Sequence, residues 1–275
     1  MHFRLLPLRF HFLARESIHF PEGKATNILR GALGTMCVEK AQMFAPSAVG
    51  GPSGLLNLPR PFVFRAKHLN GLTVQAGQTF YFDLNLFDLA PVATENLVSA
   101  FTRLAREGLG PTRSKVELTQ VSLRAQAQGA MIPLSFDLNA AAQPVRHLRI
   151  RFLTPTELKS GERLTTSPEF GILAARARDR ISTLSQLYGE GALALDFKGF
   201  GERAAQVRMT RCELTHVAVE RRSSRTGQVH SIGGFIGDAE YEGEITEFLG
   251  VLQVAQWTGV GRQTVWGKGE IELNP

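Results

Sequence analysis

Glycine and cationic residues alternate in one stretch near the end of the chain. Two glycine pairs, Gly259-Val260-Gly261 and Gly267-Lys268-Gly269, flank a five-residue spacer. Glycine tolerates positive φ and carries no Cβ, so backbone N–H groups can approach a bulky anion closely. The stretch therefore predicts a phosphate-binding loop, and a glycine-rich hairpin is the structural alternative. Its candidate contact residues are Gly259, Gly261, Arg262, Gln263, Gly267, Lys268 and Gly269.

Two common nucleotide motifs do not fit this loop. A P-loop needs four residues between its glycines and Ser or Thr after the Lys, but here Gly269 follows Lys268. A dinucleotide fingerprint needs glycine where Thr264 stands, and it opens a helix. This loop leads instead into an expected final strand at 270–273. A nucleic-acid backbone is therefore the favoured ligand.

A second cationic stretch lies earlier in the chain. Arg221, Arg222 and Arg225 crowd an expected hairpin tip, and His230 follows on the return strand. Like charges at a tip repel one another, and a polyanion would relieve that repulsion. We expect these four residues to contact RNA, with a solvated tip as the alternative.

The bulk composition agrees with a polyanionic partner. The 275 residues carry a formal net charge of +6, which favours nucleic acid. Cys37 and Cys212 lie far apart without metal-ligand spacing, so we expect buried thiols and a cytoplasmic protein. The N-terminus lacks the features of a signal peptide, and no run reaches the length of a membrane span.

The order of the expected elements predicts an α+β protein. The first half shows a strand from about Leu6, a helix from about Thr26, strands at 61–65 and 79–87, a helix at 94–107 and a strand at 115–127. This order is typical of a ferredoxin-like, or split βαβ, domain.

The second half shows the same order. A strand at 147–153 precedes a helix at 170–187, a long strand at 206–222, its partner at 228–235, a helix at 248–256 and the last strand. We therefore expect tandem ferredoxin-like (RRM-like) domains at 1–145 and 146–275.

Several stretches together resemble the CRISPR repeat-RNA processing endoribonucleases of the RAMP superfamily. They are Leu29-Arg30-Gly31-Ala32-Leu33-Gly34, Arg151-Phe152-Leu153-Thr154-Pro155, Ser223-Ser224-Arg225, Gly233-Gly234-Phe235-Ile236-Gly237, Tyr241-Glu242-Gly243 and the glycine-rich loop. Their order and spacing cover nearly the whole chain.

The resemblance implies tandem ferredoxin-like domains that bind CRISPR repeat RNA and cut it once, without a cofactor. In this family a ribose 2′-OH attacks the phosphorus without a metal ion, leaving a 2′,3′-cyclic phosphate and a 5′-OH. A general base, a general acid and nearby cations suffice for that step. A CRISPR effector complex is a further expected partner. The sequence leaves the oligomeric state open between a monomer and a homodimer.

The catalytic histidine of many relatives follows a glycine equivalent to Gly34, where this chain has Thr35. We therefore consider His19, before the first helix, and Lys40, at its end, as catalytic candidates. An exposed turn histidine and a lysine favoured by the helix dipole are the alternatives. Lys24 and Arg30 are candidate phosphate contacts. The alternative for Arg30 is a plain solvated side chain.

Two other functions compete with the enzyme. A non-catalytic RNA-binding subunit of a CRISPR effector complex has the same fold, and Thr35 favours it. A phosphate-loop protein unrelated to RNA is disfavoured, because the loop fits neither the P-loop nor the dinucleotide fingerprint. An acidic run lacks the ligand spacing of a calcium loop, so we expect a solvated face and no metal site; its members are Asp238, Glu240, Glu242, Glu244 and Glu247.

Overall fold

The computed structural model describes residues 1–36, 58–124, 131–139, 143–218, 220–222, 229–231 and 233–275. The chain divides into two compact units. The N-terminal unit comprises Arg4–Ser135, and the C-terminal unit comprises Phe136–Pro275 together with Met1–Phe3. The boundary expected at residues 145 and 146 stays a prediction.

The N-terminal unit follows the order βαββαβ. Its sheet has the strand order β3-β5-β1-β6, all antiparallel, with the short β7 also paired to β1. Numbered by position in the βαββαβ motif, that order is 2-3-1-4, which is the ferredoxin-like arrangement. The strands are β1 (His2–Ala14), β3 (Phe62–Arg65), β5 (Thr79–Leu86), β6 (Val116–Leu123) and β7 (Leu134–Asp137), and the helices are α1 (Ala25–Met36), α2 (Pro91–Thr102) and α3 (Leu104–Glu107).

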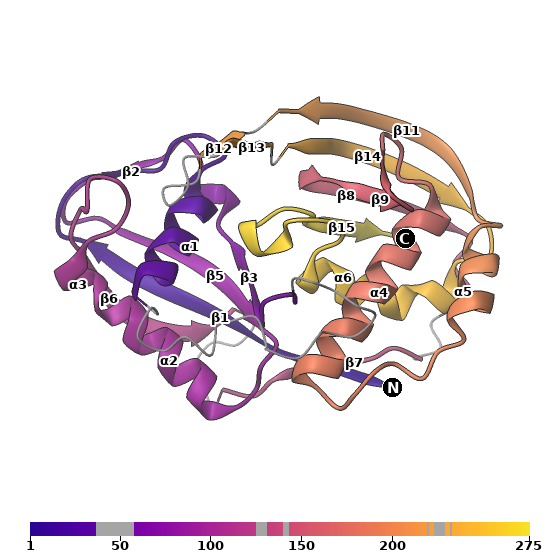
Figure 1. Ribbon diagram of the computed structural model, residues 1–275, viewed down its shortest axis with the longest axis horizontal. Helices are drawn as coiled ribbons and strands as arrows, with labels where there is room; N and C mark the ends of the chain where they lie inside the picture. The colour runs from indigo at the N-terminus through magenta and orange to yellow at the C-terminus, as the bar shows by residue number, and fades with distance from the viewer. Residues whose placement is uncertain (37–57, 125–130, 140–142, 219, 223–228, 232) are drawn as a thin grey trace. The chain divides into compact units, whose positions relative to one another are not determined.

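Three smaller elements complete the N-terminal unit. Strand β2 (Ile18–His19) pairs with β4 (Thr73–Val74), and the 3-10 turn η3 (Lys67–Leu69) precedes β4. Figure 1 shows α1 and α2 on one side of the sheet.

Aromatic side chains fill the space between this sheet and its helices. Phe10 and Phe12 on β1 are fully buried and stack on Phe82 of β5, with ring centroids 5.3 Å and 5.6 Å apart. Phe101 of α2 packs against Phe10 at 4.8 Å. The period-2 alternation of β1 places these rings on one face, as expected from the sequence.

The C-terminal unit repeats the motif. Its sheet has the order β11-β14-β8-β15, again 2-3-1-4 within the motif. The strands are β8 (His147–Thr156), β9 (Leu158–Ser160), β10 (Arg163–Thr165), β11 (Arg208–Val217), β12 (Glu220–Arg222), β13 (Val229–Ser231), β14 (Gly234–Glu242) and β15 (Ile271–Asn274). The helices are α4 (Phe170–Tyr188), α5 (Phe197–Ala204), η4 (Thr246–Phe248), α6 (Leu249–Thr258) and η5 (Thr264–Trp266).

Helices α4, α5 and α6 gather on one side of this sheet (Figure 1). Phe170 of α4 packs edge-on against Tyr241 of β14 and against Phe248, each at 5.2 Å. The Tyr241 hydroxyl is buried and donates to the Pro168 carbonyl oxygen at 2.7 Å. Burial raises the pKa of Tyr241 far above its usual range. The expected fold class, α+β with tandem ferredoxin-like units, is confirmed.

The strand expected at 206–222 does pair with the expected partner at 228–235, but in two pieces and over a longer range. Strand β11 pairs with β14 from Arg208↔Glu242 to Val217↔Gly234, so the partner extends beyond residue 235. Residues 220–222 form β12, which pairs with β13 in a two-stranded hairpin. One expectation about β11 is wrong. Cys212 is an exposed thiol rather than a buried one, because β11 is an edge strand of the sheet; Cys37 lies outside the described residues. None of the described helices is long and apolar enough to cross a membrane.

Candidate nucleic-acid interface

The glycine-rich loop connects α6 to β15 through left-handed backbone. Gly259 ends α6 at φ 74°, and its N–H donates to the Ala255 carbonyl oxygen at 2.8 Å. Gln263 at φ 60° and Gly267 at φ 74° flank the 3-10 turn η5. Left-handed backbone is costly for a residue with a Cβ, so Gln263 is held there by the packing of the loop.

The loop is docked on the end of β8 and on Glu157, the residue that follows it. The Arg262 N–H donates to the Glu157 carbonyl oxygen at 3.0 Å, and the Gly269 N–H donates to the Pro155 carbonyl oxygen at 3.2 Å. A Cβ on Gly261 would collide with the Glu157 carbonyl oxygen. The glycine pattern therefore has a structural cause within the chain, whatever ligand the loop binds.

The two cations of the loop have different environments. Arg262 pairs with the Glu157 carboxylate at 3.1 Å and its side chain is 47% exposed. Lys268 is only 6% exposed and belongs to the packed interior of the loop. Arg262 is thus the loop cation that a phosphate can reach, and contact between Lys268 and RNA stays a prediction.

His19 lies before the first helix, as expected, on the short strand β2 that follows the end of β1 at Ala14. Its side chain is exposed, and Nδ1 lies 2.9 Å from the Thr73 hydroxyl on the paired strand β4. This contact orients one ring nitrogen and leaves the ring at the surface. An imidazole in this setting can accept or donate a proton.

The other sequence-derived candidates are dispersed. Lys24 and Arg30 are half-buried, Lys24 before α1 and Arg30 within it. The predicted basic hairpin is present as backbone, with Arg221 of β12 opposite His230 of β13 and Arg222 opposite Val229. Lys40 and Arg225 lie outside the described residues. Their roles stay predictions.

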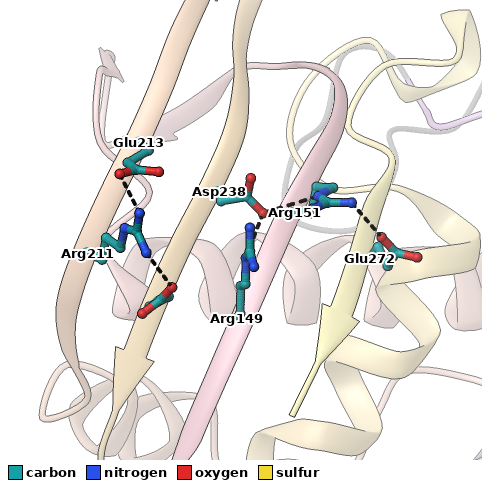
Figure 2. A network of polar contacts seen from close by, with 7 residues as sticks. Arg149, Arg151, Arg211, Glu213, Asp238 and Glu272 are labelled. Atoms are coloured by element: carbon teal, nitrogen blue, oxygen red, sulfur yellow. Dashed lines mark hydrogen bonds and ion pairs between the residues drawn. The ribbon is translucent and has the colours of Figure 1, made fainter.

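The acidic run is neutralised by arginines across neighbouring strands. In Figure 2, Arg149 and Arg151 of β8 converge on Asp238 of β14, at 3.0 Å and 3.2 Å. Burial alone would raise the pKa of Asp238, but the hydrogen bonds from both arginines lower it below its usual range.

The same pairing continues along the sheet. Arg211 bridges Glu213 at 2.7 Å and Glu240 at 3.5 Å, and Arg151 also reaches Glu272 at 3.8 Å (Figure 2). The three remaining acidic residues of the run are paired as well: Glu242 with Arg208, Glu244 with Arg146 and Glu247 with Arg203. Sequence reasoning missed these pairs because most partners are 29 to 89 residues apart in the chain.

The second half of the chain matches a known protein family. A family model described as CRISPR-associated endoribonuclease Cas6 matches residues 150–271. The C-terminal unit carries the Cas6 family pattern. This Cas6 match confirms the resemblance to the CRISPR repeat-RNA processing family, and it supports a CRISPR-associated RNA endoribonuclease. A second model, described as an N-terminal domain, matches residues 39–143.

Solved structures agree on the fold over the whole chain. A Cas6 product complex aligns with a TM-score of 0.64 and 19% identity, covering 98% of this chain and 100% of that one. Thermus thermophilus Cas6 aligns with a TM-score of 0.63 and 17% identity, covering 98% of each chain. A product complex of another Cas6 aligns with a TM-score of 0.59 and 16% identity, covering 99% of this chain and 100% of that one. No curated protein matches this chain.

Proposed function

We propose that this protein is a CRISPR-associated endoribonuclease that binds CRISPR repeat RNA and cleaves it by attack of a ribose 2′-OH, without a metal ion. The observation that carries the proposal is the Cas6 match over residues 150–271, which includes the glycine-rich loop. Two further features support it: the exposed Arg262 on that loop and the exposed His19 in the other unit.

The chemistry requires no group beyond those that side chains supply. The 2′-OH forms a bond to the adjacent phosphorus as the bond from phosphorus to the 5′-oxygen breaks. The 2′-OH loses its proton to a base, and the leaving 5′-oxygen gains one from an acid. Cations stabilise the charge that develops on the phosphoryl oxygens. The products are a 2′,3′-cyclic phosphate and a 5′-OH.

In this proposal His19 transfers one of these two protons, and Arg262 binds the RNA backbone. Imidazole is suited to proton transfer near neutral pH, and the Nδ1 contact with Thr73 at 2.9 Å fixes the ring. Arg262 has a planar guanidinium that can bind phosphate in a bidentate manner. Its present partner, Glu157, holds the side chain in place.

Cleavage of repeat RNA in EDTA, with identification of the product ends, tests the proposal. We expect a single cut that leaves a 2′,3′-cyclic phosphate. His19→Ala should lower the single-turnover rate by about 100-fold, the lower range for one proton-transfer group. His216→Ala is the matched control, because His216 is an exposed histidine on β11.

Two outcomes would contradict parts of this proposal. A cut that needs a divalent cation would refute the mechanism. Binding of the repeat RNA without any cut would favour a non-catalytic RNA-binding subunit of a CRISPR effector complex. An unchanged rate in His19→Ala, with normal cutting by the wild type, would remove His19 from the chemistry.

A further inference from the structure

Cationic side chains gather where α3 turns into β6 in the N-terminal unit. We call Arg103, Arg106, Arg113 and Lys115 the basic turn. Glu107 pairs with Arg106 at 3.0 Å, and Glu16 accepts the Lys115 backbone N–H at 2.8 Å. Four cations against these two carboxylates leave a local charge of +2.

The electrostatic field of the basic turn acts on its own carboxylate. The hydrogen bond from Arg106, aided by the charges of Arg103 and Arg113, lowers the pKa of Glu107. The Arg106 side chain is 76% exposed, and Arg113 is exposed as well. The excess charge is therefore presented to solvent.

The basic turn is built as a rigid loop. Leu109 and Ser114 exchange two backbone hydrogen bonds, at 2.8 Å and 3.1 Å. The Lys115 ammonium donates to the Arg106 carbonyl oxygen at the end of α3. A Cβ on Gly108 would collide with the Arg113 carbonyl oxygen, which shows how closely the loop closes on itself.

Arg113 is held in a left-handed conformation at φ 50°. Among the described residues, the other non-glycine residue at positive φ is Gln263 of the glycine-rich loop. Such strain persists where the surrounding structure imposes it, and it clusters at functional sites. The N-terminal unit thus has a fixed, strained cation in its own loop.

The same loop is anchored to the segment that carries His19. The Ser114 hydroxyl donates to the Ser17 carbonyl oxygen at 2.8 Å, two residues before His19. A Cβ on Gly110 would lie 3.5 Å from Ile28 of α1 and 3.9 Å from Ile18 of β2. The basic turn and His19 therefore share one scaffold within the unit.

The outward face of the C-terminal sheet provides a contrast. Its four arginines are Arg149, Arg151, Arg208 and Arg211, and their carboxylate partners are Glu213, Asp238, Glu240, Glu242 and Glu272. Four cations and five carboxylates give these side chains a net formal charge of −1. That face therefore has no excess positive charge to attract a polyanion, whereas the basic turn has an excess of +2.

We propose that the basic turn binds phosphates of the RNA strand that reaches His19. This inference rests on the proposed function, because it assigns part of the path of the same RNA. Arg106 and Arg113 make the phosphate contacts, and Lys115 fixes the loop through the carbonyl oxygen of Arg106. Phosphate contacts of this kind position the strand without reading its sequence.

The test is the salt dependence of repeat-RNA binding by the full chain, measured by fluorescence anisotropy with labelled RNA. The variant is Arg106→Gln with Arg113→Asn, since Asn tolerates left-handed backbone. Losing two single-strand phosphate contacts should reduce the slope of log K against log salt by about 1.4. At 0.1 M salt this corresponds to about 25-fold weaker binding.

The matched control is Arg149→Gln with Arg151→Gln, which removes the same net charge from the C-terminal sheet face. Its slope should equal that of the wild type. Arg106→Gln alone changes a largely exposed side chain and should reduce the slope by about 0.7. This single variant keeps the test decisive if the double variant unfolds, as judged by thermal unfolding.

The outcomes separate this inference from the proposed function. Equal slopes for the basic-turn variants and the control, with normal binding and cutting by the wild type, would overturn the inference and leave the enzyme standing. A wild type that neither binds nor cuts repeat RNA would overturn both. A reduced slope confined to the basic-turn variants supports the inference.

Discussion

Gly269 allows the most direct test of why the glycine-rich loop needs glycine. Gly269 sits at φ 68°, and a Cβ there would collide with the carbonyl oxygen of Val260. The Val260 N–H donates to the Gly269 carbonyl oxygen at 2.9 Å, so a shift would also strain this hydrogen bond. Gly269→Ala therefore faces two separate costs.

The magnitude follows from those two costs. Left-handed backbone costs an alanine about 1–2 kcal/mol, and forcing an extra carbon into a packed site costs about 1–3 kcal/mol more. We expect Gly269→Ala to lower the free energy of unfolding of the C-terminal unit by about 2–5 kcal/mol. Gly161→Ala is the matched control, because Gly161 has φ 58° and nothing within 4 Å of its Cβ position. Only the backbone cost of about 1–2 kcal/mol applies to it.

Urea unfolding followed by tryptophan fluorescence measures this difference. The chain has two tryptophans, Trp257 and Trp266, and both lie in the C-terminal unit. The signal therefore reports on the unit that contains the loop. Equal losses for Gly269→Ala and Gly161→Ala would refute the close-packing explanation of the loop glycines.

Three further predictions address packing, pH and binding. Arg178→Ala should lower the free energy of unfolding in urea by about 2–3 kcal/mol. The reason is that the buried guanidinium donates to the Phe197 carbonyl oxygen at 2.6 Å and lies 4.4 Å from the centre of the Phe197 ring. A loss under about 0.5 kcal/mol would contradict this role. The lowered native pKa of Asp238 means that its ion pairs stabilise the fold above the unfolded-state pKa near 4 and are lost as pH falls through the native pKa. The Tm difference between wild type and Asp238→Asn should therefore shrink from about pH 6 to about pH 3, and a constant difference would argue against it. Arg262→Ala should weaken RNA binding and reduce the salt slope by about 0.7, whereas an unchanged slope in anisotropy titrations would remove Arg262 from the interface.

Local sequence patterns sufficed for the elements with a strong period. The helix expected at 170–187 is α4, Phe170–Tyr188, because its apolar residues recur at helical spacing. The last strand is also present, shifted by one residue to Ile271–Asn274. The order of elements then sufficed for the ferredoxin-like class, since that motif fixes which strands neighbour one another.

The full length of strand β14 was not predicted, because its alternation of apolar and polar residues is weak on both faces. Its inward positions include the small Gly237 and Ala239, and its outward positions carry carboxylates. An isolated acidic strand is unfavourable, so the sequence suggested only a solvated face for the acidic run. Its stabilisation comes from arginines on β8 and β11, which are distant in sequence.

The candidate site was predictable as a loop but not as a packed structure. The glycines correctly indicated positive φ, which four of them adopt. The groups that require them to lack a Cβ include the Glu157 carbonyl oxygen, about a hundred residues earlier. The pairing of Arg262 depends on the same distant residue, and Lys268 is buried in the folded loop, so spacing alone could not reveal either.

The central claim is that a ribose 2′-OH of the RNA attacks the scissile phosphate without a metal ion. The most direct measurement uses a repeat RNA with one 2′-deoxy substitution on the 5′ side of the cut, incubated with the wild-type protein in EDTA. We predict that this RNA binds as tightly as the unmodified repeat and is not cut at that position. Cleavage of the deoxy-substituted bond would contradict the mechanism.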